Sequence, residues 1–229
     1  MQAVHDLTPS DLDHHWREAR AEMVDQQIAR RGVADSRVLE AMGAVPRERF
    51  VPSELRHAAY DDGPLPIGEG QTISQPYVVA CMLELAQISP GDTVLEVGAG
   101  SGYAAAVLSR LAARVYAIER WPELSKVARA RLAAIGVSNV EVLHGDGSHG
   151  CAAHAPFQAI IVSAGGGQVP KALRKQLAIG GRLVMPVGAG GPQILTRVIR
   201  LAEDRYTEQP HGVVAFVPLV VGQPQPSGP

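Results

Sequence analysis

The sequence has little cysteine, little net charge and no long apolar run. Its two cysteines, Cys81 and Cys151, are too few for the disulfide framework of a small secreted domain. A net charge of -2 gives no basic surface for nucleic acid or for an anionic membrane. No stretch approaches the ~20 consecutive apolar residues of a membrane span, and the first ten residues hold no apolar secretory segment. These absences favour a cytoplasmic protein without a nucleic-acid or membrane partner.

Several catalytic and metal-binding patterns are also missing. The chain has no G-x-S-x-G nucleophile elbow and no G-K-[ST] phosphate loop, which argues against common hydrolases and nucleoside triphosphatases. His149 and His154 occur without cysteine or carboxylate at metal-binding spacing, so no metal site is predicted. What remains is an ordinary globular composition, with 46% hydrophobic and 19% charged residues. A chain of 229 residues suits one domain with a full core.

The most informative segment is an apolar strand that runs into a glycine-rich loop, VLEVGAGSGY at residues 94–103. Glycines let a ligand approach the backbone, and a strand, a loop and a helix together form a nucleotide-type site. A dinucleotide fingerprint needs a third glycine where Tyr103 stands. The form G-x-G-x-G, with Glu96 two residues before the first glycine, is typical of methyltransferases that use S-adenosylmethionine. Another nucleotide-binding α/β protein, or a tight turn without a ligand, are the alternatives.

From residue 76 onward, segments of strand length alternate with segments of helix length. This alternation predicts a doubly wound α/β sheet with right-handed crossovers. The predicted strands are 94–97, 114–119, 140–144, 157–163 and 181–187, followed by an antiparallel edge at 194–201 and 213–220. The predicted helices between them are 76–88, 103–113, 122–135 and 169–178. Further helices are predicted before the sheet, at 11–31, from Asp35 to the residue before Pro46, and from Pro52.

Residues 60–76 do not fit this alternation. Three glycines and three prolines exclude a long helix or a central strand there. A long irregular segment inside a compact domain is usually functional or disordered. Leu65, Ile67 and Ile73 are residues of the buried type and favour an ordered segment. A simple connector is the alternative.

Three acidic residues occur at or near the predicted carboxyl ends of strands, where ligands bind in such sheets. Glu96 lies within the first strand, Glu119 closes the second, and Asp146 follows the third. An acid about 20 residues past the glycine loop is placed to accept hydrogen bonds from ribose hydroxyls, and Asp146 is placed for an adenine amino group. A single acid of this kind is commonly a solvated turn residue. Three around one glycine loop favour a ligand site.

With these residues identified, the chain resembles the protein-L-isoaspartate O-methyltransferase family over roughly residues 20–221. The most specific match is LPIG at 65–68 with GQTISQP at 70–76, and the other matching blocks follow in order at 94–103, 115–120, 145–147, 180–188 and 216–219. The resemblance implies an α/β, Rossmann-like S-adenosylmethionine-dependent fold, with a seven-stranded mostly parallel sheet and extra N-terminal helices. It also implies one domain with N-terminal helices and a substrate-covering loop at 1–75, a methyltransferase core at 76–221 and a disordered tail at 222–229.

The resemblance implies roles for residues at the matching positions. Ser74 corresponds to the serine assigned to the active site. Residues that correspond to cofactor contacts are Gln71, Thr72, Ile73, Gly98, Gly100, Glu119, Asp146 and Gly147. Among them, Glu119 takes the ribose, and Asp146 with Gly147 takes adenine. The segment 216–219 would offer backbone groups to a substrate peptide. The chain departs from the family at Glu69, where many members have histidine, and at Gln158, where aspartate is usual.

The activity implied is methyl transfer from S-adenosylmethionine to L-isoaspartyl carboxylates, leaving S-adenosylhomocysteine and starting the repair of damaged peptides and proteins. A carboxylate is already ionised at neutral pH, so the reaction needs no strong base. We expect a monomer in the cytoplasm that binds damaged proteins. Two alternatives are a methyltransferase of the same fold that acts on another carboxylate or a small molecule, and a non-catalytic S-adenosylmethionine-binding protein.

Overall fold

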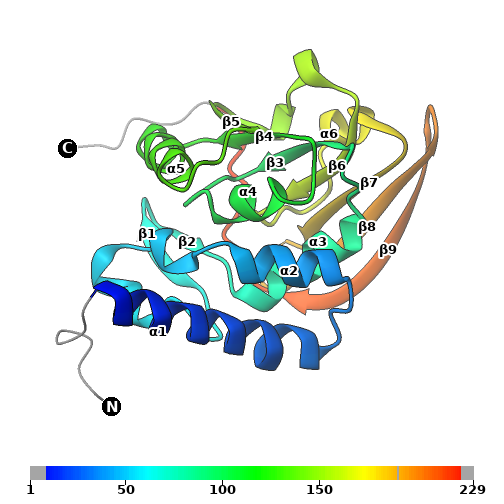
Figure 1. Ribbon diagram of the computed structural model, residues 1–229. Helices are drawn as coiled ribbons and strands as arrows, with labels where there is room; N and C mark the ends of the chain where they lie inside the picture. Colours follow the sequence, from blue (N-terminus) through cyan, green and yellow to red (C-terminus); the bar gives the residue numbers. More distant parts are fainter. Residues whose placement is uncertain (1–8, 190, 223–229) are drawn as a thin grey trace.

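The computed structural model describes residues 9–189 and 191–222, which are built around a seven-stranded sheet (Figure 1). The strands lie in the order β5-β4-β3-β6-β7-β8-β9. Their bounds are β3 Thr93–Val97, β4 Arg114–Glu119, β5 Val140–His144, β6 Phe157–Val162, β7 Leu177–Val187, β8 Gln193–Ala202 and β9 Arg205–Val214. The strands from β5 to β7 are parallel, and β8 and β9 pair antiparallel. The predicted mostly parallel sheet is confirmed.

Helices cover both faces of this sheet, which is why its central strands are apolar throughout. Side chains alternate between the faces along a strand. Val94 packs into the core that contains the helices α3, α4 and α5, whereas Leu95 packs into the core on the side of α6. The bounds of these helices are α3 Pro76–Ala86, α4 Tyr103–Leu108, α5 Pro122–Ala134 and α6 Lys171–Lys175.

The strand order reverses between β3 and β6. The chain moves outward from β3 through β4 to β5 and then returns to the other side of β3 as β6. A crevice opens at the carboxyl ends of the strands at such a point, and this is where ligands of α/β proteins bind. The glycine loop follows β3 and Ser163 follows β6, so both lie at this crevice.

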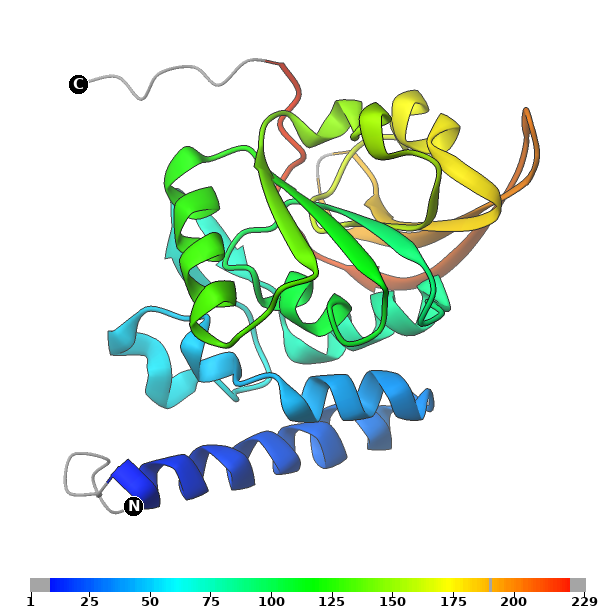
Figure 2. The same ribbon diagram turned by 45° about the horizontal axis from the view of Figure 1, so that its top comes forward.

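The N-terminal helices form a further layer on the α3 and α4 side of the sheet, drawn in blue in Figure 2. The helix α1 (Pro9–Glu22) continues through a π-helical stretch, Met23–Ile28, and a 3-10 turn, Ala29–Arg31. It ends at Gly32, whose φ of 101° suits a glycine after a helix. The predicted helix over 11–31 is thus confirmed in extent. Met23 and Ile28 are buried in the same core as α3 and β3.

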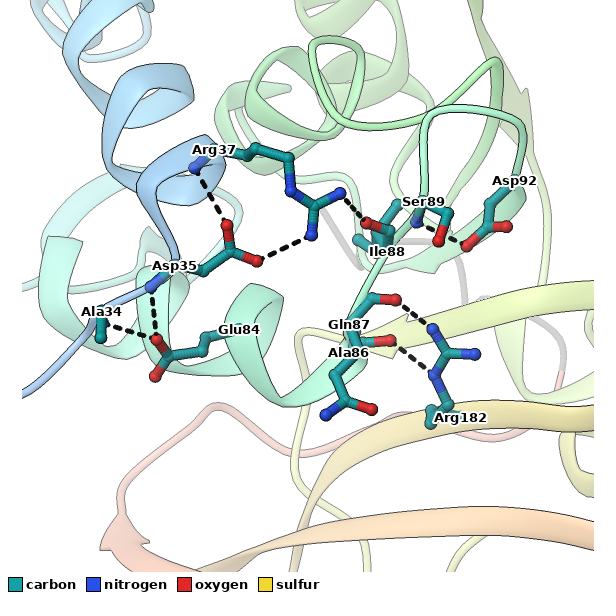
Figure 3. A network of polar contacts seen from close by, with 10 residues as sticks. All are labelled: Ala34, Asp35, Arg37, Glu84, Ala86, Gln87, Ile88, Ser89, Asp92 and Arg182. Carbon is teal, nitrogen blue, oxygen red and sulfur yellow. Dashed lines mark hydrogen bonds and ion pairs between the residues drawn. The ribbon is translucent and has the colours of Figure 1, made fainter.

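A polar network joins the second helix, α2 (Ser36–Ala44), to the end of α3 (Figure 3). The side chain of Asp35 caps α2 by accepting a hydrogen bond from the Arg37 N–H. Glu84 Oε1 accepts hydrogen bonds from the backbone N–H groups of Ala34 at 2.6 Å and Asp35 at 2.8 Å. The Arg37 guanidinium donates to the Ile88 carbonyl at 2.7 Å. These contacts fasten the N-terminal layer to the sheet domain.

The element predictions need correction in three parts of the chain. The predicted helix over 169–178 is reduced to α6, because Leu177 already pairs with Phe157 and is fully buried in the sheet's core. The predicted strand over 213–220 is wrong: pairing with β8 begins at Arg205, directly after a tight turn, and β9 ends at Val214. Pro218 lacks the N–H that a ladder needs, and it makes only an isolated bridge with Gly165.

The third part contains two adjacent segments. The segment from residue 52 was expected to be helical, and the segment at 60–76 was expected to be irregular. The chain from residue 52 forms a 3-10 helix, Ser53–Ala58, rather than an α-helix. The segment predicted to be irregular at 60–76 contains a small antiparallel hairpin of β1 (Leu65–Gly68) and β2 (Gln71–Ile73). Residues 223–229, most of the predicted disordered tail, lie outside the described part of the chain.

Candidate functional site

A pocket lies at the carboxyl ends of β3, β4 and β6, where the strand order reverses. Two segments form opposite rims. We call residues 98–102, which follow β3, the glycine rim, and residues 60–74, which carry the β1–β2 hairpin, the flap. Nearly all the predicted site residues line this pocket: Gln71, Thr72, Ile73, Ser74, Gly98, Gly100, Glu119 and Gly147. Asp146 is the exception.

The glycine rim needs glycine for its backbone and for space. Gly98, Gly100 and Gly102 have φ values of 87°, 51° and 87°, a region that residues with a side chain rarely adopt. A Cβ atom on Gly100 would come within 3.2 Å of the Ile67 side chain of the flap. The N–H groups of Gly98 and Ala99 both donate to one carbonyl at the end of β4. The rim is therefore a fixed, bare backbone surface that faces the flap.

Glu119 holds this rim from the end of β4. Its side chain is buried, and Oε2 accepts a hydrogen bond from the Gly100 N–H at 2.7 Å. Oε1 accepts a second bond from the Trp121 N–H at 2.9 Å. Each carboxylate oxygen has a further lone pair, so Glu119 can also accept a hydroxyl from a ligand in the pocket.

Glu96 lies beside Glu119 in a different state. It is fully buried, it lines the pocket, and neither of its oxygens has a hydrogen-bonding partner among the described residues. Burial first, and then the negative charge of Glu119, raise the pKa of Glu96 well above its ordinary value of 4.5. The pocket thus combines one hydrogen-bonded carboxylate with one unpartnered carboxyl group whose pKa is raised. The sequence drew attention to Glu96 without giving it a role.

Asp146 stands just outside the pocket lining. Its Oδ1 accepts a hydrogen bond from the Ser148 N–H at 2.9 Å, and its Oδ2 accepts one from the Gly222 N–H at 2.8 Å. Burial acts to raise the pKa of Asp146, but these hydrogen bonds outweigh it and leave the pKa lowered. The neighbouring Gly147 does line the pocket, and a Cβ there would lie 2.4 Å from a methyl carbon of Val97. Only glycine fits at position 147.

The flap reaches the pocket through its hairpin. The two-residue turn has Glu69 and Gly70 at φ values of 52° and 66°, the positive values that a type I′ turn requires. Ile67 of β1 and Ile73 of β2 are buried. Ser74 is half-buried at the end of the flap, and within the described chain its carbonyl, not its hydroxyl, is hydrogen-bonded. This hydroxyl is free to donate to a substrate.

A third segment, residues 217–220, closes the pocket from the C-terminal side. Gly165 fixes it at one end, donating its N–H to the Val217 carbonyl at 2.8 Å and accepting from the Leu219 N–H at 2.7 Å. At the other end, Arg120 donates to the carbonyls of Val220 at 3.0 Å and Gly222 at 2.6 Å. Sequence reasoning did not predict these contacts of Gly165 and Arg120, because both join residues far apart in the chain.

The described residues contain neither a cluster of metal ligands nor a membrane-spanning helix. Across residues 9–189 and 191–222, no three histidine, cysteine, aspartate or glutamate side chains gather as a metal site would require. None of the helices in that part of the chain combines the length and the apolar character of a membrane span.

Comparison with known proteins gives one consistent family. Residues 18–224 match the family model described as Protein-L-isoaspartate(D-aspartate) O-methyltransferase. A protein of Methylorubrum populi named protein-L-isoaspartate O-methyltransferase is 55% identical over 89% of this chain and 96% of its own length. A protein of the same name from Protochlamydia amoebophila is 57% identical over 86% of this chain and 95% of its own.

Solved structures agree with this assignment. A structure named protein-L-isoaspartate O-methyltransferase has a TM-score of 0.78 and 27% identity, covering 90% of this chain and 66% of its own. A Plasmodium falciparum structure in complex with S-adenosyl-L-homocysteine has a TM-score of 0.77 at 23% identity, covering 88% of this chain and 98% of its own, and so shares its fold. The pocket, the family model and relatives more than half identical lead to the same result: the chain belongs to the protein-L-isoaspartate(D-aspartate) O-methyltransferase family.

Proposed function

We propose that this protein transfers a methyl group from S-adenosylmethionine to the free carboxylate of L-isoaspartyl residues in peptides and proteins, the first step in their repair. One observation carries the proposal. The glycine rim with Glu119, and the flap with Ser74, meet at a single pocket in a member of this family. A cofactor side and a substrate side therefore lie next to each other.

The residues present fit S-adenosylmethionine. Gly98 and Gly100 leave the backbone bare where a Cβ would meet Ser163 and Ile67, and we assign these glycines to the methionine end. Glu119 keeps acceptor capacity for the ribose hydroxyls. We assign Gln71, Thr72 and Ile73 to the flap side of the cofactor.

Adenine would lie toward Gly147, at the end of β5. We assign Gly147 and Asp146 to the adenine end. Because Asp146 Oδ2 accepts the Gly222 N–H, an adenine amino group must share this oxygen or displace the Gly222 contact. The role of Asp146 thus depends on the segment that follows Val220.

The chain can perform this reaction without an acid–base pair. When bound, S-adenosylmethionine supplies an electrophilic methyl group. An α-carboxylate with a pKa of about 3.5 is ionised at neutral pH and needs no base to activate it. The Ser74 hydroxyl donates a hydrogen bond that orients this carboxylate, and orientation is worth much of a methyl-transfer barrier. The flap and residues 217–220 exclude water, which would otherwise stabilise the separated charges of the reactants.

The test is transfer of labelled methyl to a synthetic isoaspartyl peptide, with the aspartyl peptide of the same sequence as control. We expect base-labile label in the isoaspartyl peptide alone. Equal labelling of both peptides would identify a methyltransferase of other specificity. Binding of S-adenosylmethionine without any transfer would identify a non-catalytic protein.

The proposal also includes a monomer in the cytoplasm that acts on damaged proteins and not on nucleic acid. Cys81 and Cys151 are free thiols, which fits a reducing compartment. The net charge of -2 gives no basis for nucleic-acid binding.

A further inference from the structure

Arg47 is a fully buried arginine whose guanidinium connects the two ends of the flap. Its Nε donates a hydrogen bond to the Ala59 carbonyl at 2.8 Å, directly before the first flap residue. Its Nη2 donates to the carbonyl of Ser74, the last flap residue, also at 2.8 Å. One planar group therefore joins both ends of a loop whose hairpin lines the pocket.

The position of Arg47 is costly for a charged group. No carboxylate of the described chain lies within ion-pair distance, and Nη1 is buried without a hydrogen-bonding partner. The ring of Tyr103, which also lines the pocket, lies 4.8 Å from the guanidinium carbon in a cation–π contact. Burial lowers the pKa of Arg47. Taking a charge out of water without an ion-pair partner is costly for the folded state. The charge therefore calls for a role beyond stability.

We propose that Arg47 is a positioning residue, which clamps the ends of the flap and thereby sets the place of the Ser74 hydroxyl over the pocket. The inference rests on the proposed function, since it assigns the effect of Arg47 on catalysis to Ser74. Fixing the Ser74 peptide fixes the direction of its Cα–Cβ bond. Only the rotation of the hydroxyl group about that bond is then left free.

The other polar contacts of the flap are either more open to solvent or confined to its first residue, Tyr60, whose hydroxyl accepts a buried hydrogen bond from Arg20 and donates one to Glu48. Gln75 donates to the Asp62 carboxylate at 2.7 Å, and Arg31 donates to the same carboxylate at 2.9 Å, but both contacts are exposed. Gln27 donates to the Tyr60 carbonyl at 2.8 Å in a half-buried position. Water can replace the exposed contacts at little cost. It cannot replace the buried Arg47 bonds as easily, and Arg47 is the buried group that joins the two ends of the flap.

The chain offers a matched control in Arg182. This half-buried arginine also donates from Nε and Nη2 to two carbonyls, those of Ala86 at 2.8 Å and of Gln87, at the end of α3 (Figure 3). It does not line the pocket and does not touch the flap. Replacing either arginine by lysine keeps the charge but removes the planar fork that reaches two carbonyls. Arg47→Lys therefore loosens the flap, whereas Arg182→Lys loosens the end of α3.

We expect Arg47→Lys and Arg47→Gln to lower kcat for the isoaspartyl peptide by about tenfold or more, since small displacements of a positioning group cost this much. The loss of S-adenosylhomocysteine affinity should be smaller than the loss of kcat. Arg182→Lys should keep kcat within about twofold of the parent protein. Equal kcat values for the Arg47 and Arg182 variants would overturn the proposal.

Hydrogen exchange gives a readout that does not depend on activity. In Arg47→Lys, amides of β1 and β2 should exchange faster while those of β3 and β6 stay as in the parent protein. Faster exchange in all strands, or failure of both Arg47 variants to fold, would show a merely structural residue and contradict the proposal. If the parent protein transfers no methyl group but the flap amides alone respond, the clamp is supported while the proposed function fails.

Discussion

The two rims of the pocket are held in place by different kinds of contact. The glycine rim is anchored by its own backbone, since its N–H groups donate to the Ile118 carbonyl and to Glu119 on the neighbouring strand. The flap is anchored by a side chain from another part of the chain, because Arg47 contacts carbonyls 12 and 27 positions away. The cofactor side is thus held by contacts with the adjacent strand of the sheet, whereas the substrate side depends on a buried side chain from outside the sheet. Substitutions at the glycine rim should lower cofactor affinity, whereas substitutions at the flap should lower the rate of methyl transfer.

The largest effect is expected from removing the carboxylate of Glu119, which holds the glycine rim in place. Glu119→Ala leaves the Gly100 and Trp121 N–H groups without an acceptor in a buried place. Each such group costs about 1–3 kcal/mol. We expect S-adenosylhomocysteine to bind about 30- to 100-fold more weakly, which corresponds to about 2–3 kcal/mol. Titration calorimetry measures this loss, with the exposed Glu123→Ala as control. Affinity within threefold of the parent protein would remove Glu119 from the site.

The flap should lose rate rather than cofactor affinity. Ser74→Ala removes a hydroxyl that has no other partner within the described residues. A hydrogen bond to a charged group contributes about 1.5–3 kcal/mol, so kcat should fall by roughly 10- to 100-fold. S-adenosylhomocysteine affinity should change by less than about threefold. Steady-state kinetics with the isoaspartyl peptide and calorimetry on the same preparation separate the two quantities. Equal losses in both would contradict the assignment of Ser74.

A pH experiment distinguishes the two glutamates of the cofactor side. Because the pKa of Glu96 is raised in the folded protein by burial and by Glu119, the unfolded chain releases this proton at a lower pH than the folded one. In the window between the two pKa values the folded state binds the extra proton, so this group lowers the free energy of unfolding as pH rises.

Glu96→Gln has no such proton. The unliganded variant should be more stable than the parent protein at pH 7, and the difference should disappear below the ordinary pKa of 4.5. Urea unfolding at a series of pH values measures it. A parent protein that is the more stable of the two at pH 7 would mean that Glu96 is ionised and paired.

The smallest effect is expected at the exposed fastening of the flap. Asp62→Asn weakens the ion pair with Arg31 but keeps an oxygen for Gln75. Exposed pairs contribute about 0–1 kcal/mol, so the free energy of unfolding should fall by less than about 1 kcal/mol and kcat by less than about twofold. Thermal unfolding and the methyl-transfer assay check this. A loss as large as that of Arg47→Lys would show that the exposed contact, and not the buried one, holds the flap.

The same contrast explains how much the sequence could predict. The glycine rim follows from local rules, because alternating glycines after a strand need positive φ values and bare backbone wherever they occur. The parallel strands and the places of Glu119 and Gly147 follow from periodicity and chain order. The resemblance to the family identified the flap, but its hairpin was missed, since the type I′ turn at Glu69 lacks the usual asparagine or aspartate.

The long-range contacts could not be predicted. The sequence around Arg47, with Pro46 and Glu48 beside it, indicates an ordinary surface charge. In the folded protein Arg47 is buried and donates to the Ser74 carbonyl. The end of β9 was missed for a similar reason. Residues 217–220 leave the sheet and contact Gly165 and Arg120, and no local sequence pattern indicates these contacts.

The central claim is that the pocket between the two rims binds S-adenosylmethionine and its product. Titration calorimetry of the parent protein with S-adenosylhomocysteine, and separately with a nicotinamide dinucleotide, tests this claim most directly. The account predicts saturable binding of one S-adenosylhomocysteine per chain and no heat with the dinucleotide. Tight binding of the dinucleotide with none of S-adenosylhomocysteine would contradict it.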